Sequence, residues 1–323
     1  MEKILLYEPT SILDIGDRKD NDPPVPENIN LYKIPNAIIT PYGFIIKNLH
    51  VFKPTLSFRH KNSCSFINIL LFSFFKTKKK ISEPALSISF GWYDSYYHFT
   101  CECLVKLFLL KDYIPNSILV FPKQIQPFHA QWFKLLGVKN IVYLDNSEVI
   151  QTPLAISSEF PARDLNHHSE ILPDFSKWVL EKINIQNQKK IKKIFVGRKN
   201  PTRRKLLNND EVKTLITSLG FEYVEMEEMS IEQQIATFHH AEQIISVHGA
   251  ALSNLIFSKK GTFVLDLCQE DFKQWCFLKL AMVQELKYEF LYCKSPTNTE
   301  LPGYRDIVVN IQDLKSKIES WNQ

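Results

Sequence analysis

Glycine, cysteine and long apolar runs are all scarce in this sequence. Glycine occurs nine times in 323 residues, so each place where it stands is informative. The six cysteines form no CxxC pair and lie among apolar neighbours, which argues against a disulfide scaffold or a cysteine metal site. The most apolar run, 66–75, has half of the roughly 20 residues that a membrane helix needs. We therefore expect no membrane span, and reduced cysteines in a cytoplasmic protein.

A strong charge of either sign is missing as well. The net charge of +4 suits a protein that binds phosphorylated ligands, although an ordinary surface gives the same value. Basic residues do not alternate with aromatic ones in any nucleic-acid-binding motif, so we expect no nucleic-acid partner. The 45% apolar content is enough for a sizeable core, and the length fits two domains.

The apolar run 66–75 is followed directly by a basic segment, KTKKK at 76–80. We expect a buried strand or helix followed by a solvated turn. Peripheral contact of 66–80 with an anionic membrane is the alternative, because a basic run beside an apolar one suits such a surface. Residues 1–10 become polar too soon for a signal peptide. The predicted location is the cytoplasm, and membrane contact would place the protein at the inner face of the membrane.

Strand and helix patterns alternate along most of the chain. The first 60 residues hold only short strand-like pieces around a polar, proline-bearing stretch. From about residue 85, buried strands at 117–121 and 140–144 flank helical periodicity, most clearly at 95–110. This alternation is typical of a parallel sheet with helices on its faces, so the pattern predicts an α/β fold.

The same rhythm begins again after a charged, glutamine-rich stretch near 184–190, where we place the domain boundary. Two domains, 1–186 and 187–300, follow from it. The segment 301–323 holds a terminal helix, which we expect to pack back on the N-terminal domain. The second run is predicted to contain strands at 193–197, 243–247 and 262–267, and a helix that begins at the capping box of Ser230 and Gln233.

A tight junction between a predicted strand and a predicted helix surrounds Gly249, in the sequence IISVHGAALSN. The amides of Gly249, Ala250 and Ala251 would open the helix, and the positive end of the helix dipole favours an anion there. Small residues let a diphosphate approach the backbone, and His248 and Asn254 add side-chain donors. The junction predicts an anion site, with a tight turn that binds nothing as the alternative.

A basic loop follows the predicted strand 193–197. Arg198 leaves the carboxyl end of this strand, and Arg203 and Arg204 follow in a segment broken by proline. Ligands of open α/β sheets bind beyond the carboxyl ends of the strands, where His248 is also expected. The planar arginine group donates paired hydrogen bonds to phosphate. The loop therefore predicts a phosphate site, with a solvated basic turn as the alternative.

The helical segment 95–110 carries a candidate for acid–base chemistry. His98 and Glu102 lie four residues apart and so share one face of a helix. A histidine that a carboxylate orients is a workable general base near neutral pH. Asp94, just before the helix, competes for the same role, and a structural histidine among aromatic residues is the alternative to catalysis.

Residues 91–270 resemble glycosyltransferase family 61. The family pattern has an arginine after a strand, an arginine cluster, an asparagine, a Gly-Phe pair, a Ser…Gln pair and an HGAxLxN signature. The matching positions are Arg198, Arg203 or Arg204, Asn208 or Asn209, Gly220, Phe221, Ser230, Gln233, Ala241, His248, Gly249, Ala250, Leu252 and Asn254.

An upstream YHW…E/D element of the family resembles the segment that contains Tyr97, His98 and Glu102. Two positions depart from the family pattern. Phe99 stands where tryptophan is usual, and Ala251 where many members have a second glycine. An acceptor or donor different from that of the eukaryotic members is a reasonable consequence of these changes.

The resemblance implies a GT-B-like fold, with two Rossmann-type domains facing across a cleft. It also implies an inverting, metal-independent glycosyltransferase whose substrates are a nucleotide-diphosphate sugar, by default a UDP-sugar, and a glycan or lipid-linked glycan acceptor. The N-terminal domain would bind the acceptor, with His98, Asp94 and Glu102 as catalytic candidates. The C-terminal domain would bind the donor, and no further cofactor is expected. The implied donor-binding residues are Arg198, Arg203, Arg204, His248, Gly249, Ala250 and Asn254, with Glu228 or Glu270 on the ribose.

Family members without a membrane anchor look like bacterial enzymes of surface or capsular polysaccharide synthesis, which is the role implied here. A literal DxD motif, used by metal-dependent glycosyltransferases of another fold, occurs at Asp20 to Asp22. It lies among charged residues and prolines rather than at the end of an apolar strand, so we expect no metal there. The alternative functions are a nucleotide-sugar epimerase or pyruvyl transferase on the same architecture, and a non-catalytic sugar-binding protein.

Overall fold

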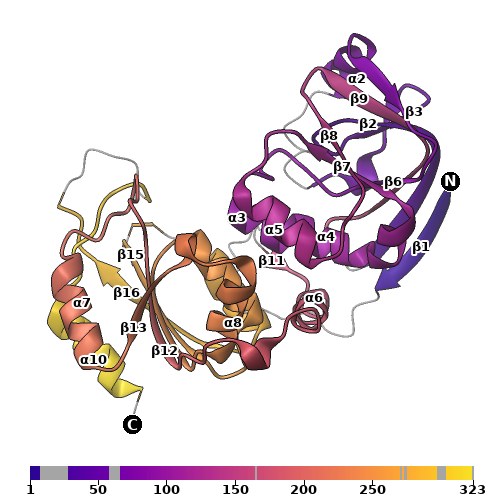
Figure 1. Cartoon of the computed structure of the whole chain (residues 1–323). Helices are drawn as coiled ribbons and strands as arrows, with labels where there is room; N and C mark the ends of the chain where they lie inside the picture. The colour runs from indigo at the N-terminus through magenta and orange to yellow at the C-terminus, as the bar shows by residue number, and fades with distance from the viewer. Residues whose placement is uncertain are drawn as a thin grey trace. The chain divides into compact units, whose positions relative to one another are not determined.

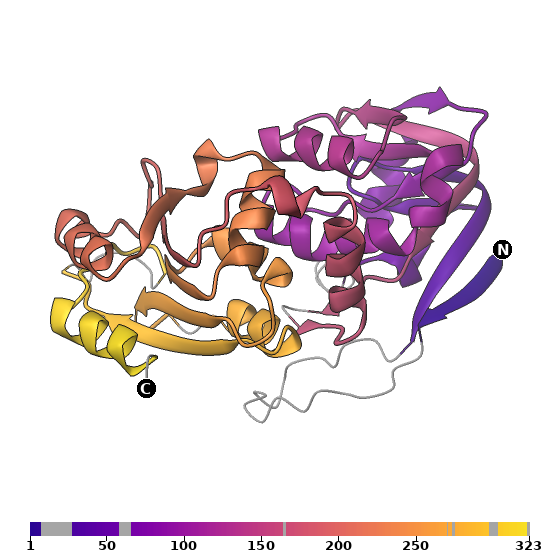
Figure 2. The ribbon, with the colours of Figure 1, turned by 60° about the horizontal axis from the view of Figure 1, so that its bottom comes forward.

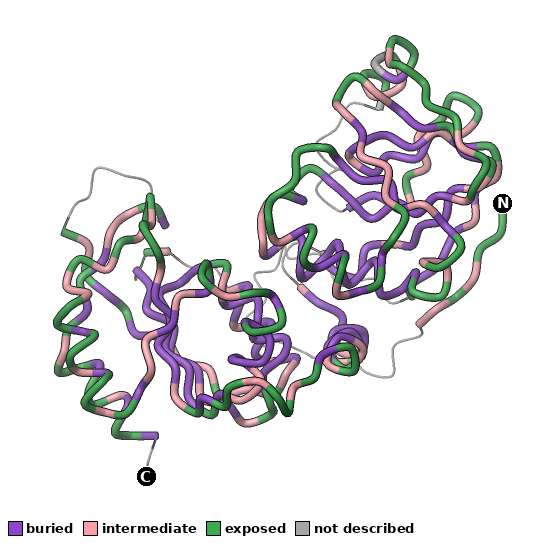
Figure 3. The backbone as a smooth tube through the Cα atoms, viewed as in Figure 1, coloured by how far each residue is buried: buried purple, intermediate pink, exposed green. Residues whose placement is uncertain are grey.

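A computed structural model describes the chain at residues 1–7, 28–57, 66–163, 166–269, 271–272, 275–296 and 303–321. The chain divides into two compact units, Met1–Lys182 and Ile183–Gln323 (Figure 1). Each unit has its own sheet, and buried residues fill the interior of each (Figure 3).

The first unit is built on a mixed sheet. Its described strands follow the order β4-β3-β2-β9-β6-β7-β8, with β1 added to β2 and β5 added to β9. Strands β6, β7 and β8 run parallel to one another, whereas β2 runs antiparallel to β1, β3 and β9. The strands are β1 (Glu2–Tyr7), β2 (Ile29–Ile39), β3 (Ile45–Lys47), β4 (His50–Val51), β5 (Thr77–Lys80), β6 (Ala85–Ser87), β7 (Ile118–Pro122), β8 (Ile141–Leu144) and β9 (Glu148–Ser158).

This sheet differs from the Rossmann-type domain that the sequence led us to expect. The expected alternation is present only in the parallel part, where β6, β7 and β8 follow one another with helices between them. The two longest strands, β2 and β9, pair antiparallel with Ile34 opposite Ala155. Partners so distant in sequence leave no mark in a local hydrophobic pattern, and their pairing turns a parallel sheet into a mixed one.

The helices of the first unit include one with an irregular turn. The expected helix at 95–110 is α3 (Tyr96–His98), a π-helical turn at Phe99–Cys103, and α4 (Leu104–Leu109). Turns of this kind bulge a helix and often occur where a side chain has a functional position. The other main helices are α2 (Phe66–Phe74), α5 (Pro127–Leu135) and α6 (Ile171–Leu180).

The segment 66–80 corrects one expectation. Residues 66–74 form a helix, α2, but several of its apolar side chains are exposed rather than buried. The basic residues that follow form strand β5, parallel to β9, instead of a solvated turn. Backbone pairing with β9 holds this strand, because all four of its residues are exposed.

The second unit is built on a parallel sheet, as the alternating pattern predicts. The order of its described strands is β13-β12-β14-β15-β16, and every neighbouring pair is parallel. Counted along the unit this is the order 2-1-3-4-5 of doubly wound folds, whose direction of winding reverses between β12 and β14. The strands are β12 (Lys193–Gly197), β13 (Glu222–Glu225), β14 (Gln243–Val247), β15 (Phe263–Gln269) and β16 (Lys287–Cys293).

Helices cover both faces of this sheet. α7 (Asn209–Ser218) and α10 (Ile311–Ser320) lie on one face, and α8 (Ile231–His240) lies on the other (Figure 1 and Figure 2). The predicted capping box at the start of α8 is confirmed, because Ser230 and Gln233 each accept a hydrogen bond from the other's backbone amide. The 3-10 helix η6 (Ala250–Phe257) and α9 (Cys276–Val283) complete the helical layer.

The terminal helix α10 belongs to the core of the second unit. Leu314, Ile318 and Trp321 are buried together with Val212 and Ile216 of α7 and with residues of the sheet. We expected this helix to pack on the N-terminal domain. The structure shows it packed in the core of its own unit.

Among the described residues, no helix combines the length and apolarity needed to cross a membrane. The five described cysteines, Cys101, Cys103, Cys268, Cys276 and Cys293, are buried. Burial raises the pKa of each of Cys276 and Cys293 to about 12, so both thiols stay protonated and behave as small core residues.

Candidate functional site

A cavity of about 490 Å³ opens at the carboxyl ends of three strands of the second unit. Gly197, Glu225 and Val247, the last residues of β12, β13 and β14, all line it. The cavity therefore includes the point where the winding of the sheet reverses, which is where open α/β sheets bind their ligands. The remaining lining residues are Phe195, Arg198, Lys199, Asn200, Pro201, Arg204, Lys205, Leu206, Asn209 and Tyr223.

Two arginines of the basic loop, Arg198 and Arg204, line this cavity, whereas Arg203 is exposed and is not among the lining residues. Arg198 Nη1 donates to the carbonyl oxygen of Arg203 at 3.0 Å, which folds the loop back on its first residue. Burial lowers the pKa of Arg198. Burial, followed by the charges of Arg198 and Arg203, lowers the pKa of Arg204 to about 10. Arg198 and Arg204 are two half-buried like charges that repel each other, with the exposed Arg203 adding to this repulsion, and a bound anion would relieve it.

The glycine of the HGA segment lies beside the same arginines. A methyl group added at Gly249 would stand 3.9 Å from Cζ and Nε of Arg198. Ala250 is exposed and Ala251 half-buried at the start of η6, so only small side chains surround the opening amides of this helix. The structure thus brings together the two elements that the sequence proposed as a phosphate site. They meet because β12 and β14 are neighbours in the sheet.

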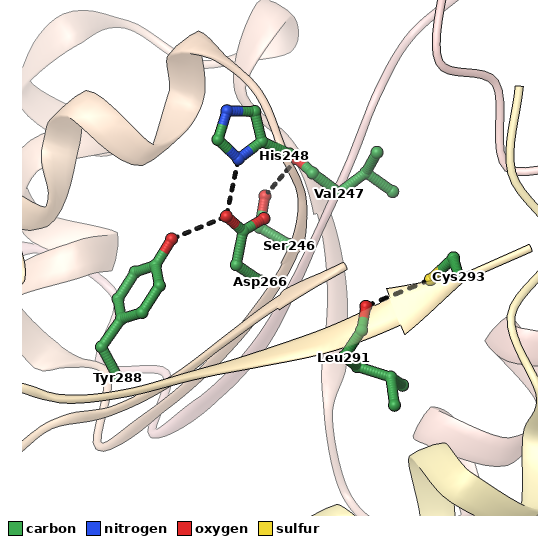
Figure 4. Close-up of polar contacts among 7 residues, drawn as sticks. All are labelled: Ser246, Val247, His248, Asp266, Tyr288, Leu291 and Cys293. Atoms are coloured by element: carbon green, nitrogen blue, oxygen red, sulfur yellow. Dashed lines mark hydrogen bonds and ion pairs between the residues drawn. The ribbon is translucent and has the colours of Figure 1, made fainter. Parts of the chain in front are cut away.

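His248 is held by a buried carboxylate on the next strand. Its Nδ1 lies 2.6 Å from Oδ2 of Asp266, and the Tyr288 hydroxyl donates to the same oxygen at 2.7 Å (Figure 4). Because a carboxylate only accepts, the proton of this hydrogen bond lies on Nδ1. Burial and the neighbouring Asp266 hold the pKa of Tyr288 well above its ordinary value, so the hydroxyl remains a donor.

Two buried polar atoms near this group have no hydrogen-bond partner among the described residues. They are Oδ1 of Asp266 and Nε of Arg204. The Asp266 charge acts on Arg204, and the Arg204 guanidinium also stands 5.6 Å from the centre of the Phe272 ring. Asp266 therefore links the His248 side chain electrostatically to the arginine cluster.

The remaining predicted donor residues have different surroundings. Asn254 is completely buried, and its Nδ2 donates to Oε1 of Gln234 at 3.3 Å, which ties η6 to α8. This contact gives Asn254 a structural role, and its predicted contact with the donor stays a prediction. Glu228 is exposed and forms an ion pair of 2.6 Å with Lys199. Glu270 lies outside the described residues.

A carboxylate that the sequence analysis did not consider, Glu225, lines the cavity. It is the last residue of β13, the strand adjacent to β12. An acidic residue in the second strand region of dinucleotide-binding folds accepts hydrogen bonds from ribose hydroxyls, and Glu225 has that place here. The signal available in the sequence was its position near the end of FEYVEM (221–226), a segment with strand-like apolar and aromatic residues.

The first unit contains the second candidate site. His98 Nδ1 lies 3.0 Å from Oε1 of Glu102, across the π-helical turn. The predicted pairing of these two side chains is therefore present. Phe99, next to His98, is fully buried against Phe121, Phe133 and His129, so its ring anchors the turn in the core.

Two residues in the turn before α3 complete this site. Trp92 is 40% exposed and stacks on the His98 ring, with centroids 5.6 Å apart and planes inclined by 29°. Asp94 is exposed in the same turn. Trp92 was missed from the sequence, where it stands outside the helical pattern. An exposed ring beside a candidate base offers an apolar platform for a sugar.

Groups of metal ligands are absent from the described residues: no cluster of three or more His, Cys, Asp or Glu side chains is placed to hold an ion. The DxD motif at 20–22 lies outside the described residues.

The chain matches the family described as Glycosyltransferase 61 over residues 96–265. It is also similar to Beta-1,2-xylosyltransferase XAX1 of Oryza sativa subsp. japonica, with 22% identity over 207 residues. This alignment covers 56% of the present chain and 36% of the Oryza protein, so the chain spans about a third of that relative. The family match includes His98, the arginine loop and the HGA segment, and it extends over more than half of the sequence. The chain belongs to glycosyltransferase family 61.

Proposed function

We propose that this protein is an inverting glycosyltransferase that moves a sugar from a nucleotide-diphosphate donor to a glycan acceptor. The observation that carries this proposal is the meeting of Arg198, Arg204 and the Gly249 backbone at the switch point of the second sheet. Crowded, half-buried arginines beside a helix N-terminus suit a diphosphate, which brings two negative charges and several acceptor oxygens.

The reaction needs a base and a group that stabilises the departing diphosphate. The base takes the proton of an acceptor hydroxyl, whose oxygen attacks the anomeric carbon from the face opposite the leaving group. The bond from that carbon to the diphosphate oxygen breaks, and the nucleoside diphosphate leaves with the bonding electrons. Arg198 and Arg204 would compensate the negative charge that develops, a task that a divalent cation performs in other enzymes.

The first unit supplies the candidate base. Glu102 accepts the Nδ1 proton of His98, which in the neutral ring would leave Nε2 to take the proton of the acceptor hydroxyl. Trp92 would hold the acceptor sugar against this imidazole. Asp94 is the competing base, and its exposed position in the turn makes it the natural comparison variant.

The finer identity of the substrates is also proposed. Glu225, which lines the cavity, would bind the ribose hydroxyls of the donor. Glu228, the candidate from the sequence, forms an ion pair with Lys199 and is the alternative. UDP-xylose is the first donor to assay, because the Oryza relative is described as a xylosyltransferase. A role in surface polysaccharide synthesis on the cytoplasmic side of a membrane fits a glycan or lipid-linked glycan acceptor.

The test is a thermal-shift panel of UDP, CDP, GDP and their sugars in the presence of EDTA. A ligand at 100 times its Kd stabilises the folded state by about 2.7 kcal/mol, which raises the melting temperature visibly. Arg198→Ala should weaken the binding of the nucleotide diphosphate by about 10- to 100-fold, because a charge-assisted hydrogen bond is lost. Lys259→Ala, which removes an exposed cation from the same unit, should bind as wild type does.

A metal-free shift that Arg198→Ala abolishes and Lys259→Ala retains would support the donor site. No shift with any nucleotide, or a shift that appears only with a divalent cation, would contradict the metal-independent mechanism. Transfer of xylose, glucose or another sugar is then measured with the donor that binds, by following release of the nucleoside diphosphate.

A further inference from the structure

Helix α2 presents an apolar face to solvent. Ile67, Leu71 and Phe74 are 70%, 53% and 55% exposed, and Phe75, which follows the helix, is 89% exposed. At about 100° per residue, positions 67, 71 and 74 fall within roughly 60° of the helix circumference. The exposed side chains therefore form one stripe instead of being scattered around the helix.

The apolar residues of this helix are not confined to its inward side: Ile69 and Leu70 are half-buried, and further apolar residues are exposed beside Asn68. Ser73 is buried, and its hydroxyl donates to the carbonyl of Leu70 at 2.7 Å, while isoleucine, leucine and phenylalanine face outward. A surface helix normally turns its apolar stripe to the core. A large exposed apolar stripe marks a surface that another body covers.

A row of lysines lies directly beside the stripe. Strand β5 carries Lys78, Lys79 and Lys80, all exposed, and Lys76 precedes it. Lys79 pairs with Glu148 at 2.8 Å, which offsets one of these charges. Lys78 reaches back over the ring of Phe74, with 5.6 Å between Nζ and the ring centre. The apolar stripe and the lysines therefore form one continuous surface, which we name the α2–β5 patch (Ile67, Leu71, Phe74, Phe75, Lys78, Lys79 and Lys80).

Protection of a sheet edge explains only half of this patch. Lysines on an outer strand discourage pairing with another chain, and β5 pairs with β9 alone among the described strands. That role gives no reason for exposed phenylalanine and leucine next to the strand, which would promote association. An occupant that is apolar and negatively charged accounts for both halves.

We propose that the α2–β5 patch docks the first unit on an anionic lipid surface. The helix lies in the plane of the interface, its apolar stripe enters the boundary between headgroups and acyl chains, and the lysines contact acidic headgroups. Nine residues are too few to span a bilayer, so the contact is peripheral. A second copy of the chain fits less well, because it would bring a second row of lysines against the first.

The test is cosedimentation of the whole protein with vesicles. One set contains phosphatidylcholine alone, and the other contains phosphatidylcholine with about one third phosphatidylglycerol, which supplies the negative surface that lysines recognise. Wild type should bind the anionic vesicles, and binding should weaken as salt is added because the attraction is screened. Binding to the neutral vesicles should be much weaker.

Two variants remove the two halves of the patch separately. Lys78→Gln/Lys79→Gln/Lys80→Gln should lower the partition coefficient on anionic vesicles about fivefold per lysine, or roughly 100-fold. Leu71→Gln/Phe74→Gln/Phe75→Gln keeps good helix formers but removes three apolar side chains, and should lower binding by about 100-fold or more on both vesicle types. The affected side chains are exposed, so melting temperatures should stay close to wild type.

Matched controls change the same chemistry elsewhere on the surface. Lys3→Gln/Lys134→Gln/Lys139→Gln removes three exposed lysines of the same unit, and Leu5→Gln/Leu207→Gln/Val308→Gln removes three exposed apolar side chains. Both controls should bind anionic vesicles as wild type does.

The proposal is overturned if wild type does not bind anionic vesicles, or if the patch variants bind no worse than their controls. If wild type formed a dimer that either patch variant dissociates, and bound no vesicles, this patch would instead be an interface between copies of the chain. None of these results depends on donor binding.

Discussion

The two units each contain a histidine hydrogen-bonded to a carboxylate, but the surroundings of the pairs differ. His98 and Glu102 belong to one helix, and their side chains are 16% and 11% exposed. His248 and Asp266 come from neighbouring strands, and their side chains are 4% and 0% exposed. The same chemical pair thus occurs once at a surface and once inside the protein.

Exposure decides what each pair is able to do. The imidazole of His98 is partly open and has the exposed Trp92 stacked on it, so we expect it to be able to exchange a proton with a substrate. A closed imidazole, whose carboxylate is shared with the Tyr288 hydroxyl, holds a fixed orientation and stabilises the fold around the arginine loop. We therefore expect substitutions at the first pair to affect rate, and substitutions at the second to affect stability.

The largest effect is expected from His98→Ala. Loss of a general base lowers kcat by about 10²- to 10⁴-fold, while donor binding should be unchanged because the nucleotide is assigned to the second unit. Steady-state kinetics and a nucleotide thermal shift measure the two quantities side by side. Asp94→Asn serves as the comparison, and should leave kcat within a few-fold of wild type.

The opposite result would overturn the assignment of His98 as the general base. If Asp94→Asn abolishes transfer and His98→Ala keeps it, the aspartate is the base. Glu102→Gln gives a finer test. It retains an oxygen that accepts from Nδ1, so its loss of kcat should be smaller than that of His98→Ala.

Asp266→Ala should be the most destabilising change at the buried pair. Two donors, His248 Nδ1 and the Tyr288 hydroxyl, lose the Asp266 acceptor and stay in the interior, so we expect about 3–5 kcal/mol lower stability. The comparison is Glu102→Ala, which removes one hydrogen bond at a partly open site and should cost about 1 kcal/mol. Scanning calorimetry of both variants measures the difference, and equal losses would show that burial does not separate the two pairs.

The fold of the second unit was largely predictable from sequence, and that of the first was not. Strands β12 and β14 have the bounds that the pattern predicts, because parallel strands here are short apolar runs separated by amphipathic helices. In the first unit, β2 and β9 pair antiparallel across more than a hundred residues. Local periodicity contains no information about such a partner, so the mixed sheet could not be derived.

The candidate sites show the same division. The arginine loop and the HGA segment could be assigned to one site, because the carboxyl ends of parallel strands meet at one edge of a sheet. Asp266 could not be paired with His248, since register decides which residues of neighbouring strands meet, and here Asp266 stands opposite Ser246. One signal was available: a lone acidic residue inside the apolar strand TFVLDL is rarely buried without a partner.

A third histidine extends the comparison to a ring whose hydrogen bonds go to backbone groups. His129 is fully buried, its Nδ1 accepts from the backbone of Gln126 at 2.8 Å, and its Nε2 donates to the carbonyl of Tyr93 at 2.9 Å. Burial lowers its pKa from 6.5 to about 4, against the smaller opposing effect of these hydrogen bonds. The folded state therefore keeps His129 neutral at a pH where the unfolded chain takes up a proton.

The sign of the resulting pH dependence follows directly. The contribution of the neutral, buried His129 to folding stability is fully present above pH 6.5. It is lost as the pH falls from 6.5 toward 4, because the unfolded chain takes up a proton there first. A lowering of this size corresponds to about 3 kcal/mol. We expect His129→Gln to be less stable than wild type near neutral pH, and the gap in unfolding free energy to narrow as the pH falls. A gap that stays constant over this range would show that His129 is not held neutral by burial.

The smallest expected effect comes from the tyrosines that flank the two sites. Tyr288→Phe removes one of two hydrogen bonds to the Asp266 carboxylate and should cost about 1.5–3 kcal/mol, because the acceptor is charged. Tyr97→Phe is the counterpart in the first unit, where the hydroxyl lies 2.8 Å from Nε2 of His167. A bond between neutral groups contributes about 1 kcal/mol, so the loss of stability in Tyr97→Phe should be smaller.

Since the pKa of Tyr288 lies well above its ordinary value, the loss of stability in Tyr288→Phe should be constant between about pH 6 and 9. If the two variants lost the same stability, the charge on Asp266 would contribute nothing to holding His248 in place, and the contrast between an open and a closed pair would rest on exposure alone.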